Sequence, residues 1–333
     1  MLFVVPIESY DSRYTEQWNR WFPSYLRRAG IPFAVVEGSS SVAPVDRQEV
    51  LDPYGTHLFK FKQLYRLVQM IRDGAIGDGD VLLFHTLWFT GIDALQYLRD
   101  LTHRTFKITG VLHAGAYDPW DFRARYGMTS WAHPLECAWL SFVDRIFVAT
   151  DFHRRLLLAG VPVDPRKVFV TGLPLLRSEI TAGREGQQRE RRIIFPHRDV
   201  PEKAPEIVGR LRRIFGDSTV VRTRDVCDSK AQYYDLLATS RVCVSDSYQE
   251  TFGYAMLEAG ALGCIPVVPR RLCYPEMYPE PFLFETEDEL IARVRRALDA
   301  WVDPRTELAE LFAWTDGALE RIVHLALECA GSV

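Results

Sequence analysis

Short apolar runs alternate with helical patterns along almost the whole chain. The runs of the first part are LFVVPI, FAVVEG, VLLFH, FKITGVLH, RIFVAT and KVFVTGL, and those of the second part are RIIFPHR, STVVRT, RVCVS, IPVVP and FLF. Buried strands that alternate with helices are typical of parallel sheets covered on both faces. We therefore predict an α/β chain of two Rossmann-like domains that face a central cleft.

The expected domains span residues 1–174 and 191–314. Between them, residues 175–190 lose apolar periodicity and gain charge and glycine, which predicts a linker. Residues 315–333 are expected to form a final helix, because Leu319, Ile322, Val323 and Ala326 share one stripe.

Composition narrows the class of protein. The 333 residues are 47% hydrophobic and 25% charged, as in soluble globular domains. No stretch reaches the roughly 18 apolar residues of a membrane helix, and MLFVVPIESYDS lacks the basic start of a signal peptide, so we expect a cytoplasmic protein. Six cysteines without a Cys-x-x-Cys pair indicate reduced core residues, and a net charge of -4 offers no overall attraction to nucleic acid.

Residues 242–269 contain Glu250 and Glu258, with seven residues between them. The pattern predicts a strand at 241–245, a helix at 251–262 ended by Gly263, and a strand at 265–268. Eight steps along a helix are about 12 Å and little more than two turns, so both carboxylates would lie on nearly the same side.

A helix start favours a phosphate, because its backbone N–H groups point outward. Carboxylates beside that phosphate would accept hydrogen bonds from hydroxyl groups. These features together describe a nucleotide sugar, bound at the amides of Thr251, Phe252, Gly253 and Tyr254.

Arg198 and Lys203 flank the turn that follows the strand RIIF. Ligands of open α/β sheets bind at the carboxyl ends of strands. Two cations there would neutralise a diphosphate and stabilise the charge that grows as a glycosidic bond breaks.

Residues 191–285 resemble the donor domain of GT-B-fold retaining glycosyltransferases of the family 4 type. The resemblance rests on FPHRDVPEK (195–203) and QETFGYAMLEAGALGCIPVVPRRLCYPEMYP (249–279), which are similar to the branch that includes tRNA-queuosine mannosyltransferases. It implies a UDP- or GDP-linked sugar as substrate, no cofactor and no metal. On this hypothesis Glu258 binds the ribose and Glu250 a sugar hydroxyl, and the final helix packs back onto the first domain.

The resemblance also implies that His113, at the end of FKITGVLH, touches the transferred sugar. The alternative is a histidine satisfied inside its own domain. Asp118 and Asp121 are candidates for the acceptor hydroxyl, although loop aspartates often cap turns. Arg270, Arg271 and Tyr274 to Glu276 either border the donor's base or form a structural loop. Asp78-Gly79-Asp80 is interpreted as a turn that binds no metal.

The acceptor is the least determined part. The opening region is dense in aromatic residues and arginines, which favours a nucleic-acid acceptor, with Arg13 and Tyr14 as candidate contacts. It also resembles phage-encoded glycosyltransferases that decorate modified pyrimidines in DNA, which implies host cytoplasm. The same aromatic residues have helical core spacing.

Carbohydrate, lipid and small-molecule acceptors stay open, as does a nucleotide-sugar epimerase of the same fold. A family glycine-rich loop is absent after the first strand, so the resemblance does not supply the acceptor. A dinucleotide-dependent oxidoreductase is disfavoured, because no Gly-x-Gly-x-x-Gly follows an early strand.

Overall fold

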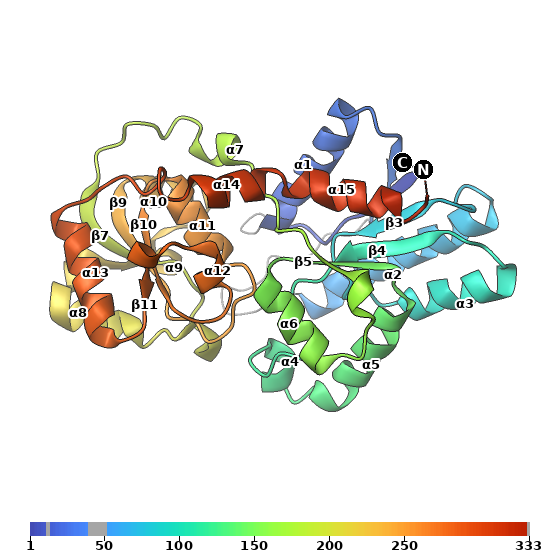
Figure 1. Cartoon of the computed structure of the whole chain (residues 1–333), viewed down its shortest axis with the longest axis horizontal. Coiled ribbons are helices and arrows are strands. Elements are labelled where there is room, and N and C mark those ends of the chain that lie inside the picture. Colours follow the sequence, from blue (N-terminus) through green and yellow to red (C-terminus); the bar gives the residue numbers. More distant parts are fainter. Residues whose placement is uncertain (11–13, 39–51, 332–333) are drawn as a thin grey trace. The chain divides into compact units, whose positions relative to one another are not determined.

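The computed structural model describes residues 1–10, 14–38 and 52–331 (Figure 1). It divides into two compact units. Unit 1 contains Met1–Pro174 and Gly317–Val333, and unit 2 contains Leu175–Asp316. Both units are α/β with parallel sheets, which confirms the predicted fold class. Within the described ranges, no helix is both long and apolar enough to cross a membrane.

The sheet of unit 1 has six strands among the described residues, in the order β2-β1-β3-β4-β5-β6. All of their pairings are parallel. The strands are β1 (Leu2–Val5), β2 (Phe33–Val35), β3 (Val81–Phe84), β4 (Lys107–Val111), β5 (Arg145–Val148) and β6 (Val168–Val170).

Helices link these strands, as the alternation predicted. They are α1 (Tyr14–Arg28), α2 (Pro53–Arg72), α3 (Ile92–Thr102), α4 (Phe122–Arg125), α5 (Thr129–Phe142), α6 (Asp151–Gly160), the 3-10 turn η1 (Pro165–Lys167) and α15 (Ala318–Glu328). Helix α15 lies beside β3 (Figure 1). The Arg145 guanidinium ties α15 to β5, because it pairs with Glu328 at 2.9 Å.

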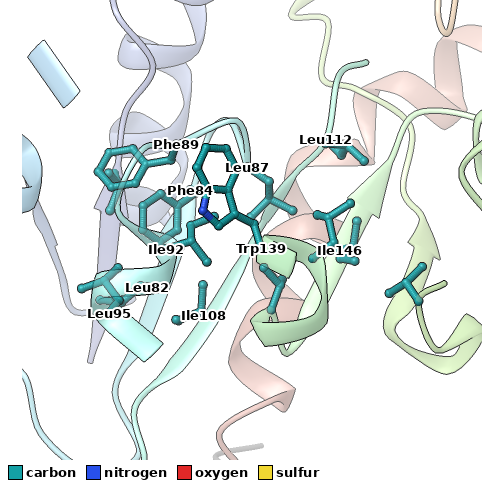
Figure 2. Close-up of a cluster of buried hydrophobic side chains, with 14 of the residues drawn as sticks. Leu82, Phe84, Leu87, Phe89, Ile92, Leu95, Ile108, Leu112, Trp139 and Ile146 are labelled. Carbon is teal, nitrogen blue, oxygen red and sulfur yellow. The ribbon is translucent and has the colours of Figure 1, made fainter. Parts of the chain in front are cut away.

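The core of unit 1 forms where the helices cover the sheet. Figure 2 shows side chains from β3, α3, β4 and α5 meeting around Trp139. Trp139 is 3% exposed, and its indole N–H donates to Asp93 at 3.2 Å. The bulky ring is thereby buried with its polar atom paired.

Unit 2, in which every residue is described, has a five-stranded sheet in the order β11-β10-β9-β7-β8. The strands are β7 (Glu190–Phe195), β8 (Val220–Arg222), β9 (Ser240–Val244), β10 (Ile265–Pro269) and β11 (Leu283–Phe284). Its helices are α7 (Arg177–Thr181), η2 (Pro201–Lys203), α8 (Ile207–Phe215), η3 (Asp217–Thr219), α9 (Thr223–Val226), α10 (Lys230–Ala238), α11 (Tyr254–Ala261), α12 (Tyr274–Met277), η4 (Glu280–Phe282), α13 (Glu287–Asp299) and α14 (Ala309–Asp316).

Three features differ from the sequence expectation. Residues 175–190 contain helix α7 and belong to unit 2, whereas they were expected to be a linker. The expected final helix, 315–333, is the shorter α15 (Ala318–Glu328) in unit 1, and α14 precedes it in unit 2 with Gly317 between them. Helix α13 was not predicted, although Thr286 caps it by accepting from the Glu289 backbone N–H at 3.2 Å.

Three of the aromatic residues of the opening region are core residues. Trp18 and Phe22 are fully buried in α1, and Trp21 is 3% exposed. Their helical spacing therefore reflects burial in the core, and these three rings offer no stacking surface for a base.

The sheet of unit 1 is closely packed around Gly110. A Cβ atom there would lie 2.7 Å from the Phe84 carbonyl oxygen and 2.8 Å from Leu87. Because one neighbour is backbone, Gly110→Ala should destabilise unit 1 by about 1–3 kcal/mol. Urea denaturation followed by tryptophan fluorescence measures the loss. The matched control is Gly77→Ala, whose nearest neighbour is 3.7 Å away, and equal stability of the two variants would contradict the close packing.

Candidate active site

Two loops meet at the carboxyl edge of the sheet of unit 2. Strands β7 and β9 are neighbours, so the loops that follow them lie side by side. The backbone N–H of Tyr248 donates to the Glu202 carbonyl oxygen at 2.9 Å. This contact brings the Lys203 side chain to the second loop, 47 residues further along the chain, where Glu250 lies.

Lys203 and Glu250 form a buried ion pair. The ammonium lies 2.9 Å from the Glu250 carboxylate and donates to the Gln249 carbonyl oxygen at 2.5 Å. Their side chains are 10% and 19% exposed. Burial acts to raise the pKa of Glu250, but the Lys203 charge and hydrogen bonds from Lys203 and the Gly253 backbone hold it below its usual value. Glu250 is therefore ionised at neutral pH.

The helix of this motif begins later than predicted. Helix α11 starts at Tyr254, and Gly253 precedes it with φ 76°. Glu250 therefore lies on a loop, and the predicted eight-step helical separation from Glu258 is wrong. The Gly253 backbone N–H, which was expected to face a phosphate, donates to the Glu250 carboxylate.

The side chains between Glu250 and α11 are packed inward. Phe252 is 2% exposed, and its ring centroid lies 5.0 Å from that of Tyr254 and 6.1 Å from that of Trp314. Thr251 is also buried. A Cβ at Gly253 would lie 2.9 Å from the ring of Tyr274, so both the backbone angle and the space require glycine there.

Glu258 has its own lysine. The Lys230 ammonium, on α10, lies 2.6 Å from the Glu258 carboxylate, and the Tyr234 hydroxyl donates to the same oxygen at 2.9 Å. Glu258 is only 2% exposed. Sequence reasoning missed Lys230 and Tyr234. One signal was present, because residues 175–316 contain only two lysines, and each pairs with one of the two glutamates.

A buried polar network lies close to the Lys203–Glu250 pair, whose charges act on His197. The His197 imidazole bonds the Ser245 hydroxyl at 2.8 Å, and that hydroxyl lies 3.1 Å from the hydroxyls of Ser247 and Tyr274. Burial, together with the charge of Lys203, lowers the pKa of His197 to about 3, so the ring is neutral.

The three arginines that the sequence singled out differ in their surroundings. Arg198 is partly buried next to His197, and its charge contributes to the low pKa of that histidine. Arg271 pairs with Asp246 at 2.6 Å and donates to the Ser247 carbonyl oxygen at 3.0 Å, which supports the structural reading. Arg270 pairs with Glu285 at 2.8 Å.

In unit 1, His113 is satisfied within its own unit. One ring nitrogen, Nε2, lies 2.7 Å from the His85 carbonyl oxygen, and Nδ1 lies 3.2 Å from the Tyr14 hydroxyl. A carbonyl oxygen only accepts, so Nε2 carries the proton and Nδ1 accepts from Tyr14. Burial lowers the pKa of His113 to about 4.

The candidate acceptor aspartates act as caps in this structure. Asp118 accepts from the Trp120 backbone N–H at 2.9 Å, and Asp121 accepts from the Arg123 backbone N–H at 3.0 Å. Both are buried. Arg13 lies outside the described residues.

Unit 1 also contains a buried ionic group, and sequence reasoning missed it. Lys60, on α2, lies 4.0 Å from the Glu8 carboxylate and donates to the Trp88 carbonyl oxygen at 2.8 Å. Thr56 donates to the other Glu8 oxygen at 3.0 Å. Burial lowers the pKa of Lys60, while the Glu8 charge opposes that shift. These contacts fix α2 to the loops that follow β1 and β3.

Comparisons with known proteins place the fold. No protein-family model matches the chain. A curated relative, the tRNA-queuosine alpha-mannosyltransferase of Drosophila melanogaster, is 38% identical over 65 residues, which are 20% of this chain and 17% of that protein. The chain therefore spans less than a fifth of the length of this relative.

Solved structures match over the whole chain. The catalytic domain of starch synthase IV from Arabidopsis thaliana, bound to ADP and acarbose, has a TM-score of 0.64 at 10% identity and 99% coverage of both chains. A glycosyltransferase from Rickettsia africae ESF-5 has a TM-score of 0.64 at 11% identity and 98% coverage of both. The chain thus has the GT-B fold of glycosyltransferases, and the expected resemblance is confirmed at the level of the fold.

The low pKa of His197 predicts a pH-dependent stability. Its folded pKa, about 3, lies below the ordinary value of 6.5, so its contribution is complete above pH 6.5 and is lost as the pH falls from there toward 3. For wild type, this residue should account for a loss of roughly 2 kcal/mol between pH 7 and pH 5. Urea denaturation of His197→Gln should show a correspondingly smaller loss. The control is His324→Gln on the exposed face of α15, and an unchanged pH dependence in His197→Gln would contradict the assignment.

Proposed function

We propose that this chain is a glycosyltransferase that moves a sugar from a nucleoside diphosphate sugar to an acceptor hydroxyl, with retention of anomeric configuration. The observation that carries the proposal is the Lys203–Glu250 pair, 2.9 Å apart at the carboxyl edge of a GT-B donor-type sheet. The structural similarity to starch synthase IV, which was solved with bound ADP and acarbose, and to the Rickettsia africae glycosyltransferase supports the proposal.

Lys203 and Arg198 would hold the donor diphosphate. A fixed ammonium in a partly buried site stabilises charge that develops on a leaving group more strongly than it would in water. Glu250 keeps Lys203 in place and, being ionised, accepts a hydrogen bond from a hydroxyl of the transferred sugar. Glu258, held by Lys230 and Tyr234, accepts from the ribose.

The reaction breaks the bond between the anomeric carbon and the diphosphate oxygen and forms a bond from that carbon to the acceptor oxygen. For retention, the acceptor attacks from the face that the diphosphate leaves. The acceptor proton passes to the departing phosphate oxygen, so the products are the glycosylated acceptor and the protonated nucleoside diphosphate. The protein supplies charge and orientation, and the proposal includes no metal or cofactor.

A nucleic acid is the proposed acceptor, with a hydroxyl on a modified base of RNA or DNA as the acceptor group. The 65-residue similarity to a tRNA-queuosine mannosyltransferase supports this choice. Unit 1 is the proposed acceptor domain, in which Tyr14, Asp118 and Asp121 stay candidate acceptor contacts and His113 stays a candidate contact of the transferred sugar.

The donor is tested first by thermal-shift screening against UDP, GDP, ADP and TDP sugars, because a tight ligand stabilises the folded state. With the best donor, Lys203→Met should lower kcat for transfer by about 100-fold or more. Removing only Lys203 leaves a buried carboxylate unpaired, so the double variant Lys203→Met/Glu250→Gln controls for lost stability. The control for general effects is Lys167→Met in unit 1.

Wild-type rates in a folded double variant would remove the assignment. Isomerisation of the donor sugar in the absence of acceptor would instead identify an epimerase. The anomeric configuration of the product, read by NMR coupling constants, tests retention separately.

The role of Glu258 has its own readout. If its carboxylate binds the ribose, wild type should bind the ribonucleoside diphosphate more tightly than its 2′-deoxy form, and Glu258→Gln should reduce that preference by roughly tenfold. Isothermal titration with both nucleotides measures the ratio. A preference that is unchanged in the variant would show that Glu258 only holds α10 against α11.

A further inference from the structure

Helix α2 exposes a continuous aromatic face. Tyr54, Leu58, Phe61 and Tyr65 are 82%, 55%, 50% and 64% exposed. They follow one another at intervals of four, three and four residues, so they lie in one row on the helix. The ring of His57 stacks on Phe61 within this row, at 6.0 Å between centroids. An exposed apolar row of this length is typical of an interaction surface.

The same helix is strongly cationic. Residues 53–72 contain two lysines and two arginines with no aspartate or glutamate, in a chain whose net charge is -4. Lys60 is buried, and Arg72 pairs with Asp73. Lys62 and Arg66 are exposed and directly follow Phe61 and Tyr65 in sequence. The Arg66 guanidinium donates to the neutral Glu37 carbonyl oxygen, which leaves its positive charge uncompensated by that contact.

Helix α3 provides an internal comparison. It exposes Tyr97 and Leu101 at 64% and 61%, four residues apart. However, it also carries Asp93 and Asp100, so its apolar positions stand among acidic ones. Exposed rings and exposed cations on a helix without an acidic residue distinguish α2 from α3.

The inner face of α2 fixes this surface in place. Gln63 donates to the Pro6 carbonyl oxygen at 2.8 Å, and Lys60 donates to the Trp88 carbonyl oxygen at 2.8 Å. Thr56 bonds Glu8 at 3.0 Å. These contacts hold α2 against the loops at the carboxyl edge of β1 and β3, and His113 bonds the His85 carbonyl oxygen at that same edge. The aromatic row is therefore part of a helix that is fixed at the sheet edge carrying His113 and Tyr14.

We propose that the exposed face of α2, formed by Tyr54, His57, Leu58, Phe61, Lys62, Tyr65 and Arg66, binds unpaired nucleotides of a nucleic acid. Bases stack on the rings, while Lys62 and Arg66 contact the phosphates that connect them. Flat rings interleaved with cations suit an unpaired strand, whose bases and phosphates alternate. The inference rests on the proposed function, since it assigns the surface that holds the nucleic-acid acceptor.

A lipid surface fits the row less well. A helix that lies in a membrane interface buries a broad apolar face in the acyl boundary. The exposed row of α2 contains one aliphatic residue, Leu58, and its two tyrosine hydroxyls and His57 add polar atoms to its rings. In a complex with an unpaired strand, by contrast, the rings of the row stack on bases and the neighbouring cations pair with phosphates.

The test is fluorescence anisotropy of the full chain with labelled single-stranded RNA, single-stranded DNA and bulk tRNA, between 50 and 200 mM salt. Phe61→Ala/Tyr65→Ala should weaken binding by roughly tenfold or more at every salt concentration, because each lost stacking contact removes base affinity. Lys62→Glu/Arg66→Glu should weaken binding at low salt and reduce the slope of log K against log salt by about 1.4.

Two control variants are matched to these changes. Tyr97→Ala/Leu101→Ala removes a comparable exposed pair from α3, and Arg166→Glu reverses an exposed charge in η1. Both should bind like wild type. Circular dichroism and donor thermal shifts should be unchanged in all four variants, which separates lost nucleic-acid binding from lost folding or lost donor binding.

Several results would overturn the proposal. The first two are a wild-type chain that binds none of the nucleic acids, and α2 variants that bind them as wild type does. The others are α2-dependent binding to vesicles of phosphatidylserine and phosphatidylcholine instead of nucleic acid, and an α2-dependent change in oligomeric state alone. If no nucleotide sugar is bound while α2-dependent nucleic-acid binding persists, the proposed transferase function fails and the surface stands. If transfer to a small acceptor proceeds normally in the α2 variants and no nucleic acid binds, the surface fails and the transferase stands.

Discussion

The contact on which the candidate site depends is the ion pair between Lys203 and Glu250. Each charge loses solvation by being buried, and the loss is offset only if both are paired and hydrogen-bonded. The loops after β7 and β9 meet that condition, because the Gln249 carbonyl accepts from Lys203 and the Gly253 amide donates to Glu250. The neutral His197 and the Ser245 hydroxyl near the pair keep its surroundings polar without adding charge. In the proposed function, this edge of the sheet holds the donor diphosphate through Lys203.

The arrangement repeats once in unit 2. Lys230 and Glu258 form a second lysine–glutamate pair, and the Tyr234 hydroxyl donates to its carboxylate. Glu258 is more deeply buried than Glu250. In the proposed function, one pair contacts the diphosphate and the sugar, and the other contacts the nucleoside. In unit 1, Lys60 and Glu8 likewise form a buried charged group. Their contacts fix the inner face of α2, while its outer face is exposed. Buried charges in both units therefore position surfaces rather than only stabilise the fold.

Several details were not predictable from local patterns. The start of α11 was placed three residues early, because Thr251 and Phe252 have acceptable helical spacing, while the left-handed Gly253 is required by the nearby Tyr274 ring. The aromatic residues of α1 matched both a stacking surface and a core stripe, and burial against His85 and His113 decided for the core. Helix α13 does carry a local signal, since Thr286 caps it by accepting from the Glu289 backbone N–H.

The sequence by itself determined the parallel α/β fold, the strands of both sheets and the Glu-x7-Glu motif, because these depend on the period of apolar residues and on local turn chemistry. The tertiary structure decided the partners. Lys203 meets Glu250 only because β7 and β9 are neighbours in the sheet, and Lys230 meets Glu258 only because α10 packs against α11. It also decided which aromatic residues face water, since α1 and α2 have similar compositions of rings and cations and only packing buries the first and exposes the second. Pairing and exposure depend on contacts between distant segments, which no local pattern encodes.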